Sequence, residues 1–468
     1  GPSAGRKDAK QNELIQLGQG GMGITFDLHA DRIGVILLSG GESLKAGECA
    51  WKTDRLASIA AGEGLLGRVV DALGNPVDGG PSPKGLSLCP IDRMAPPLVA
   101  RDYVSTPLYT GIKVIDAMLS IGRGQRELII GDPATGKTSL AVDAMINQKN
   151  SDVISIYVSI GQKKTRILRL IEQIRSCGDL SRTIILTADA ADSLVLQFLA
   201  PYSGTAIAEY FLDRGRDVLI IYDDLTRHAD VYRSLSLLLK RSPGREAYPG
   251  DIFFVHSRLL ERSARLHESY GGGSITALPI VETQQGRIAS YIPTNLISIT
   301  DGQIYLDNAL FNKGIRPAID VARSVSRIGG KAQVEALMAV SERLKIDYSR
   351  FLEAEVFTRF GAQAEEETTK LIRRGERMRE LLKQPRFHPV QLEDQVLSLL
   401  VLESGCLDRC EISEVTNRCD ETVAAIKARF PEMTVRLRSE GRINKVDMES
   451  LSQYLTQGVD EDALLGSS

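Results

Sequence analysis

Apolar residues repeat with two different periods along the chain, and the change of period separates a β-rich beginning from the rest. In residues 12–71, short runs of β-branched and apolar residues alternate with glycine-rich turns, which is typical of a small all-β unit of barrel type. The predicted strands are residues 13–17, 23–28, 32–38 and 48–52. The segment 67–78, which contains a Gly-Asn-Pro turn, is predicted to close this barrel.

The middle and the end of the chain follow other patterns. Between residues 108 and 330, apolar runs of strand length alternate with amphipathic helical stretches, which predicts an α/β domain whose parallel sheet is covered on both faces. Its predicted strands are residues 127–130, 153–160, 183–187, 217–222, 251–256 and 273–281. From Gln333 onward, heptad-like patterning rich in Glu, Arg and Leu predicts a helical domain.

These patterns predict a multidomain chain with boundaries at residues 8–75, 76–332 and 333–468. The proline-rich stretch 76–107 is expected to be an extended connector, and residues 458–468 are expected to fray.

Charge and composition exclude several classes of partner. The 57 basic and 60 acidic residues give a net charge of −3, so no global field recruits nucleic acid or an anionic membrane. No apolar run approaches the ~20 residues that span a bilayer, and the beginning lacks the apolar core of a signal peptide. Gly1, Pro2 and Ser3 resemble the scar that a protease leaves and are excluded from the fold. We therefore expect a soluble globular protein.

Cysteine usage indicates a reducing compartment, because six cysteines in 468 residues do not form a disulfide framework. Cys406, Cys410 and Cys419 lie close together in sequence, with His388 further away, so a zinc site is one alternative. Their spacing differs from that of the common zinc knuckles, which favours buried or unreactive thiols.

One short motif carries specific chemistry. An apolar run at residues 128–130 leads into Gly131, Asp132, Pro133, Ala134, Thr135, Gly136, Lys137 and Thr138, which fit G-x-x-x-x-G-K-[ST], and a helix-compatible run follows. The glycines let successive N–H groups face a polyphosphate, and the helix aims its N-terminus at the same charge. Lys137 is expected to contact the β- and γ-phosphates, and the hydroxyl of Thr138 suits Mg²⁺.

Two later strands end in polar residues that fit this phosphate loop. Asp223 ends a buried-strand pattern and can orient the water shell of Mg²⁺, although the acids at this strand end could instead cap the next helix. Gln162 ends the strand that follows the loop, where hydrolytic ATPases commonly have a carboxylate. An amide cannot take a proton at neutral pH, which favours nucleotide binding without efficient turnover, although some GTPases orient water with glutamine.

Arg327 lies beside glycines in the segment 324–330. A guanidinium on a restrained loop can stabilise a transferring phosphoryl group, including one in a neighbouring subunit, but the residues alone favour an ordinary ion-paired arginine.

Together these motifs resemble the α subunits of the rotary F-type ATP synthases. The matching stretches are residues 67–76, 110–116, 131–138, 161–163, 220–225, 243–251, 277–284, 291–295, 299–303, 314–318 and 324–327. The resemblance implies an N-terminal β-barrel, a central P-loop nucleotide-binding domain of RecA-like α/β fold and a C-terminal helical bundle. It also implies three such chains that alternate with three catalytic β subunits around a rotating γ subunit.

The resemblance assigns roles to individual residues. It implies that the chain holds ATP or ADP with Mg²⁺ without hydrolysing it, with the metal at Thr138 and, through water, at Gln162 and Asp223. It places the adenine against Phe311, Arg316, Pro317 and Gln384. Arg327 becomes the arginine finger that acts in trans on the β-subunit site during ATP synthesis or hydrolysis coupled to ion transport.

The resemblance also implies a location. The complex would lie peripherally on the cytoplasmic face of the bacterial inner membrane, or on the matrix or stroma face in an organelle. Membrane contact would come only through the ion-translocating sector, and no nucleic acid would bind.

The chain departs from the family pattern in three places. The family usually has Arg-Gln where this loop has Pro133-Ala134, and a second glutamine where Arg386 stands. Pro133 also removes one backbone donor from the phosphate cradle. The family's leading helix and first barrel strand have no counterpart before Asn12. The missing strand predicts an unpaired barrel edge, and the missing helix bears on contact with a peripheral-stalk subunit. Together they predict a divergent or N-terminally truncated copy.

Two alternatives stay open beside this interpretation. One is a stand-alone homohexameric P-loop ATPase of secretion or RNA-translocating type, which robust hydrolysis by the isolated chain would favour. The absence of a base at Gln162 and of a basic, aromatic RNA-binding surface in the barrel disfavours it. The other is a nucleotide-binding scaffold whose site has decayed.

Overall fold

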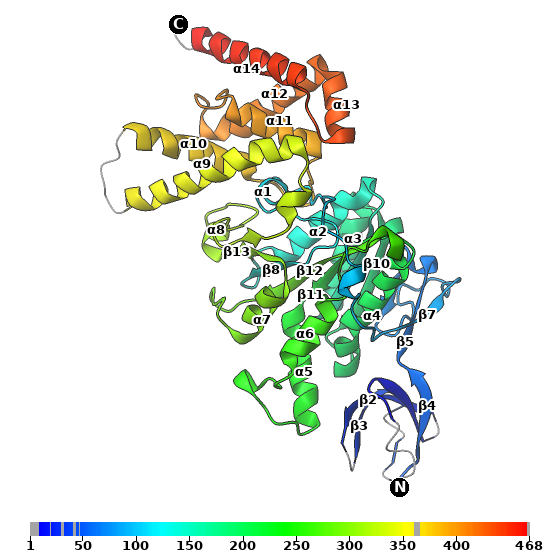
Figure 1. The fold of residues 1–468 in the computed structure, drawn as a ribbon. Coiled ribbons are helices and arrows are strands. Elements are labelled where there is room, and N and C mark those ends of the chain that lie inside the picture. Colours follow the sequence, from blue (N-terminus) through cyan, green and yellow to red (C-terminus); the bar gives the residue numbers. More distant parts are fainter. Residues whose placement is uncertain are drawn as a thin grey trace. The chain divides into compact units, whose positions relative to one another are not determined.

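The computed structural model describes residues 9–18, 20–29, 32–40, 44–45, 47–359 and 366–465 (Figure 1). Its contacts divide the chain into two compact units. The first comprises Gly1–Tyr103, Arg123–Pro133 and Gln148–Gln303, and the second comprises Val104–Gly122, Ala134–Asn147 and Ile304–Ser468. The predicted scar at residues 1–3 lies outside the described residues, as do residues 466–468 of the predicted frayed end.

The first unit begins with a four-stranded antiparallel sheet in the order β3-β2-β1-β4. Its strands are β1 (Glu13–Leu17), β2 (Gly21–Leu28), β3 (Ile33–Ser39) and β4 (Ala50–Leu56), close to the four predicted runs. Ile15, Ile24, Phe26 and Ile36 are buried, so the alternating pattern does place one face in a core. The strand-rich beginning is confirmed.

The segment 67–78 does not close this sheet, so that prediction is wrong. β6 (Val69–Asp71) pairs in parallel with β10 (Thr183–Asp189) and forms an edge of the central sheet. Val70 is fully buried there, and Asn75 N–H donates to Asp71 Oδ1 (2.8 Å) within the predicted turn. The connector that follows is mostly irregular, as expected, but β7 (Ser87–Pro90) pairs with β5 (Ser58–Ala61).

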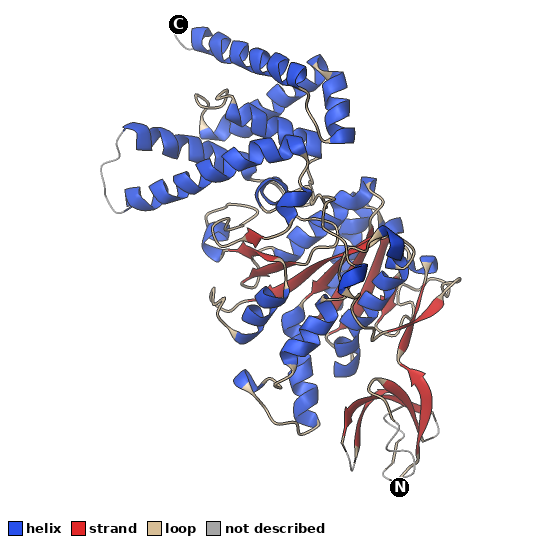
Figure 2. Cartoon of the chain, viewed as in Figure 1, coloured by secondary structure: helices blue, strands red, loops and turns tan. Residues whose placement is uncertain are grey.

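The core of the first unit is a parallel sheet whose strands run in the order β8-β12-β11-β9-β10-β6. The strands not yet named are β8 (Glu127–Gly131), β9 (Ile154–Gln162), β11 (Asp217–Asp223) and β12 (Ser274–Glu282). β8 and β9 are buried along their whole length, as strands covered on both faces must be. The predicted parallel α/β sheet is confirmed (Figure 2).

Helices pack on this sheet: α3 (Lys164–Cys177) on β9, α4 (Leu194–Leu212) on β9 to β11, α5 (Leu225–Leu238) on β12, and α7 (Tyr291–Ile299) on β8. The predicted strand at residues 251–256 is wrong, because α6 (Ile252–Leu260) occupies this segment. Ile252, His256 and Leu259 are buried whereas Phe254 is 74% exposed. That spacing is a helical face, which a short apolar run does not distinguish from a strand.

The second unit carries the helical end of the chain. Its early elements are α1 (Lys113–Met118), α2 (Lys137–Asn147), α8 (Asn308–Asn312) and β14 (Val325–Ser326), while β13 (Gly302–Leu306) begins at the end of the first unit. The predicted helical domain is confirmed as α9 (Glu335–Arg359), α10 (Glu366–Leu382), α11 (Leu392–Glu403), α12 (Val415–Arg429), α13 (Pro431–Glu440) and α14 (Lys445–Leu465). The boundaries 8–75, 76–332 and 333–468 stay predictions.

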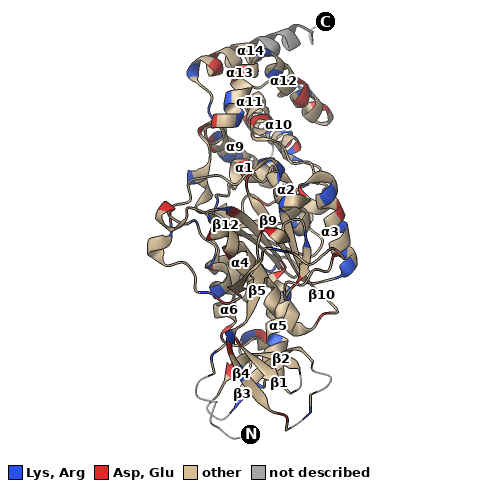
Figure 3. Ribbon diagram, turned by 90° about the vertical axis from the view of Figure 1, so that its right-hand side faces the viewer, with Lys and Arg blue, Asp and Glu red and all other residues tan. Residues whose placement is uncertain are grey.

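The six cysteines are free thiols in the structure. Basic and acidic side chains are interspersed along the described ribbon (Figure 3). Burial raises the pKa of the Cys419 thiol to about 11, which keeps it protonated and unreactive. Among the described residues, no group of three or more His, Cys, Asp or Glu is placed to hold a metal ion. None of the described helices is both long and apolar enough to span a bilayer.

Candidate functional site

The phosphate loop begins where β8 ends at Gly131, in the first unit. The Asp132 carboxylate accepts hydrogen bonds from the Thr283 hydroxyl (2.7 Å) and from the Gly286 N–H (2.8 Å). This side chain therefore ties the start of the loop to the segment after β12, and it is engaged in structure rather than directed at a ligand.

The rest of the loop belongs to the second unit and leads directly into α2. Ala134 and Gly136 have φ values of 64° and 102°, and Lys137 begins the helix. A Cβ at Gly136 would meet only Leu306, at 3.9 Å, so its positive φ rather than crowding requires glycine. Ala134 carries a strain of about 1 kcal/mol or more at its φ, as is common where backbone is shaped around a ligand. Lys137, although charged, is buried.

In the first unit, the two strand ends named by the sequence lie together. Gln162 ends β9, and its Nε2 donates to the Asp223 carbonyl oxygen at the end of β11 (3.1 Å). The Tyr157 hydroxyl donates to Asp223 Oδ2 (2.5 Å), and the Arg166 guanidinium lies 3.8 Å from the same oxygen. Burial and the neighbouring Asp223 raise the pKa of Tyr157 well above its usual value, so the phenol stays a donor.

The alternative that the acids cap a helix holds for Asp224 but not for Asp223. Asp224 precedes α5, and its Oδ1 accepts from the Arg227 N–H (2.8 Å), which is an N-cap. Asp223 instead keeps its carboxylate at the end of β11, with Tyr157 and Arg166 beside it. The role of Thr138, Gln162 and Asp223 as a joint Mg²⁺ site stays a prediction.

In the second unit, one cavity gathers the residues predicted for the base. Phe311, Arg316, Pro317 and Gln384 line it together with Thr135 and Gly136 of the phosphate loop. The Arg316 guanidinium lies 4.9 Å from the centroid of the Phe311 ring, so the two planar groups form one wall. The cavity therefore joins a flat, partly apolar surface to the start of a helix, as a nucleotide requires.

Gln384 is held by the backbone around it. Its Nε2 donates to the carbonyl oxygens of Gly111 (2.7 Å) and His388 (2.8 Å), and its Oε1 accepts from the Lys113 N–H (3.2 Å). Both amide hydrogens are therefore engaged, and Gln384 positions the cavity wall instead of donating to a base.

Two charged residues that the base prediction did not include also line this cavity, Asp143 on α2 and Arg386. Asp143 is 8% exposed, and its Oδ1 accepts from the Phe387 N–H (2.6 Å). Burial raises the pKa of Asp143 to about 7, although that N–H and the nearby Arg386 guanidinium act to lower it. A carboxyl group that titrates near neutrality is typical of functional sites.

The Arg327 segment is anchored from both sides. The Ser326 hydroxyl donates to the Ser120 carbonyl oxygen (2.7 Å), and a Cβ on Gly329 would lie 1.6 Å from the same oxygen. Arg327 itself is exposed between these two points. The loop is therefore anchored on both sides of a residue that stays exposed.

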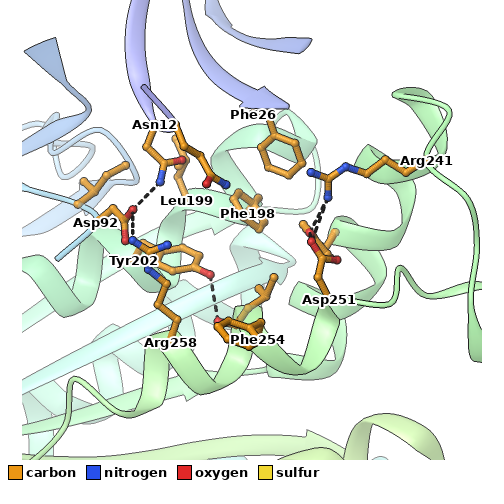
Figure 4. Close-up of a pocket in the computed structure, with 14 residues that line it drawn as sticks. Asn12, Phe26, Asp92, Phe198, Leu199, Tyr202, Arg241, Asp251, Phe254 and Arg258 are labelled. Atoms are coloured by element: carbon orange, nitrogen blue, oxygen red, sulfur yellow. Dashed lines mark hydrogen bonds and ion pairs between the residues drawn. The ribbon is translucent and has the colours of Figure 1, made fainter. Parts of the chain in front are cut away.

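A second cavity, of about 240 Å³, lies in the first unit and is lined by Phe26, Phe198 and Tyr202 (Figure 4). Its charged groups are paired with one another. Asp92 accepts from Asn12 (2.6 Å) and Arg258 (2.7 Å), and Arg241 contacts Asp251 (3.3 Å). These pairs leave the cavity without the unneutralised cations that a phosphate needs, so it is not the nucleotide site.

The sequence did not identify Asp143 and Tyr157 as site residues. It also did not show that Asp132 accepts hydrogen bonds from the segment after β12. Asp143 had a usable signal, because it lies four residues after Ser139 and therefore on the same face of a helix that opens at the phosphate loop. Tyr157 had none, since an aromatic residue in a buried strand is usually core.

Comparison with known proteins agrees with this geometry. Residues 111–326 match the ATP synthase alpha/beta family, nucleotide-binding domain, and residues 333–458 match the ATP synthase alpha/beta chain, C terminal domain. The ATP synthase subunit alpha of Caldanaerobacter subterraneus is 46% identical over 462 residues, which cover 99% of this chain and 91% of that protein. That of Petrotoga mobilis is 47% identical over 459 residues (96% and 91%), and ATP synthase subunit alpha 1 of Chlorobium luteolum is 49% identical over 441 residues (94% and 86%). The chain therefore belongs to the ATP synthase alpha/beta family and, within it, groups with the alpha subunits.

Proposed function

We propose that this chain is the regulatory, non-catalytic nucleotide-binding subunit of a rotary F-type ATP synthase. It alternates with catalytic β subunits, and three copies of each surround a γ subunit. The observation that carries the proposal is Gln162: it ends β9, is buried, and spends an amide hydrogen on the Asp223 carbonyl. The remaining amide oxygen can accept a hydrogen bond from water but cannot take its proton, so hydrolysis lacks a base.

The bound species is a Mg²⁺ complex of ATP or ADP. The backbone of Gly131 to Gly136 and the N-terminus of α2 face the phosphates, and the buried Lys137 supplies the positive charge. Hydroxyl, amide and carboxylate oxygens are the ligand types that suit this hard cation, so the residue types present fit Mg²⁺. Thr138 binds it directly, and Gln162 and Asp223 orient its waters.

The chain acts on its neighbour through Arg327. The anchored segment between Ser326 and Gly329 holds a guanidinium outward, where it can stabilise charge on a phosphoryl group in an adjoining β subunit. The complex lies on the cytoplasmic face of a bacterial membrane, or on the matrix or stroma face in an organelle, and a peripheral-stalk subunit is a further partner.

Reconstitution tests this role. The purified chain is expected to show negligible ATP turnover, and turnover should appear when it is mixed with cognate β and γ subunits and exceed that of β and γ alone. Vigorous hydrolysis by the isolated chain would instead favour the homohexameric ATPase. Binding of Mg-ATP without any effect on β would indicate a decayed scaffold.

A further inference from the structure

The base cavity of the second unit is lined by two charged groups whose hydrogen-bonding capacity is not filled by the described protein, Arg386 and Asp143. Among the residues that the structure describes, the Arg386 guanidinium has no hydrogen bond or ion pair. Asp143 uses Oδ1 for the Phe387 N–H, and its Oδ2 has no hydrogen-bond partner in the same part of the chain. The cavity therefore offers a base one cluster of donors and one acceptor.

The one carboxamide that lines this cavity is not available in the same way. Both amide hydrogens of Gln384 are spent on the carbonyl oxygens of Gly111 and His388. A free carboxamide recognises adenine by donating to a ring nitrogen and accepting from the exocyclic amine, whereas arginine recognises guanine by donating to O6 and N7. Arg386, which lines the same cavity, can only donate hydrogen bonds, because a guanidinium has no acceptor atom.

We infer that the base cavity of this chain admits guanosine nucleotides about as well as adenosine nucleotides, with Arg386 and Asp143 as the residues that determine this breadth. The inference rests on the proposed nucleotide-binding function. With guanine, Arg386 donates to O6 and Asp143 Oδ2 accepts from the N1 hydrogen. With adenine, Arg386 donates to a ring nitrogen and Asp143 accepts from the N6 amine. The wall of Phe311 and Arg316 stacks on either purine.

Titration calorimetry of the full chain with Mg-ATP and with Mg-GTP tests the inference. The two dissociation constants are expected to differ by less than about fivefold, which is the discrimination of a single weak base contact. Arg386→Gln restores a free carboxamide and should shift the ratio by about tenfold in favour of ATP. Arg386→Gln also removes a positive charge, which weakens the binding of any triphosphate. Because ATP and GTP carry the same triphosphate, this effect cancels in the ratio of their two dissociation constants.

Arg373→Gln is the matched control, since Arg373 is an exposed arginine on α10 outside the cavity. It should leave the ratio unchanged. A wild-type preference for ATP of about fivefold or more, or an unchanged ratio in Arg386→Gln, would overturn the inference while leaving the nucleotide site intact. If neither nucleotide binds, or if Lys137→Ala weakens neither, the proposed function itself fails.

Discussion

Asp143 shows how a single buried carboxyl group can make this site sensitive to pH. Its pKa lies at about 7 because burial disfavours the carboxylate more than the Phe387 N–H and Arg386 favour it. A base that donates to this carboxylate needs the ionised form. Nucleotide binding must therefore compete with protonation of Asp143 below neutral pH.

We expect the affinity for Mg-ATP to rise about tenfold between pH 6 and pH 8, since a group with a pKa near 7 is about nine-tenths protonated at the first pH and one-tenth at the second. Asp143→Asn keeps the shape and the acceptor for Phe387 N–H but does not titrate, so its profile should be flatter by that factor. The γ-phosphate titrates in both proteins and cancels in the comparison. Parallel profiles for wild type and variant would contradict the assignment.

A buried histidine pair in the first unit gives stability a dependence on pH. His228 Nε2 lies 3.1 Å from the Phe198 carbonyl oxygen and donates to it, while His228 Nδ1 lies 3.3 Å from His256 Nε2. Burial lowers the pKa of His228 to about 4, and burial together with His228 lowers the pKa of His256 well below its usual value. Both rings are therefore neutral in the folded protein.

The unfolded chain takes up a proton at His228 below about pH 6.5, whereas the folded chain does not until about pH 4. The free energy of unfolding should therefore fall as pH drops through this window, by about 2 kcal/mol for His228 between pH 7 and pH 5. His228→Gln, whose amide can still donate to Phe198, should remove that part of the slope in urea unfolding. His388→Gln, an exposed histidine, should not, and equal slopes in all three proteins would refute the account.

Residue types in the sequence were enough to place the motif between a strand and a helix, and Gln162 and Asp223 at strand ends, because these positions follow from local patterns. They were not enough to show that the Gln384 amide donates both of its hydrogens to carbonyl oxygens, those of Gly111 and His388. These acceptors lie 273 and 4 residues from Gln384 along the chain. Hydrogen-bond saturation of a side chain is a property of the folded chain, and no local pattern reports it.

At the scale of elements, α9 and α10 pack closely against each other. Phe351 and Glu355 lie four residues apart on α9 and face Gly375 and Arg379, also four apart, on α10. The Arg379 guanidinium lies 4.5 Å from the centroid of the Phe351 ring and bonds Glu355 at 3.1 and 2.7 Å. A Cβ on Gly375 would lie 2.0 Å from that ring, so the glycine permits the close approach.

Gly375→Ala should therefore destabilise the second unit. In an exposed helix this change would stabilise by about 1 kcal/mol, but overpacking against Phe351 is expected to reverse the sign and cost about 1–3 kcal/mol. Denaturant unfolding followed by circular dichroism measures it. Phe351→Leu on the same protein is the matched test, because it makes room for the new methyl group.

In a double-mutant cycle, Gly375→Ala should cost less when residue 351 is leucine than when it is phenylalanine. If Gly375→Ala stabilises the wild-type background, the close approach of α9 and α10 does not determine the choice of glycine.

Patterns along the chain were sufficient for elements that are long or covered on both faces, such as β9 and α9. They failed at residues 251–256, where six residues hold too little of either period to separate a strand from the first turns of α6. They also failed at β6, whose partner β10 lies more than a hundred residues later. Strand pairing over that distance depends on the sheet as a whole.

The proposed action on a neighbouring subunit rests on Arg327, and the structure offers two independent ways to disturb this residue. Arg327→Ala removes the guanidinium. Gly329→Ala keeps it but places a Cβ 1.6 Å from the Ser120 carbonyl oxygen, which must move the segment. If the guanidinium stabilises charge in the β-subunit site, both variants should lower multi-site ATP turnover of the reconstituted complex, Arg327→Ala by about 10³-fold or more.

The effect of Arg327→Ala should be limited to turnover by the complex. Nucleotide binding by the isolated chain should be unchanged in Arg327→Ala, because Arg327 does not line the base cavity. Lys331→Ala removes an exposed cation four residues further on and serves as the control, with turnover close to wild type. Turnover that is unaffected by Arg327→Ala would show that the neighbouring site completes its chemistry without this guanidinium, since a group that stabilises transition-state charge cannot be lost without an effect on rate.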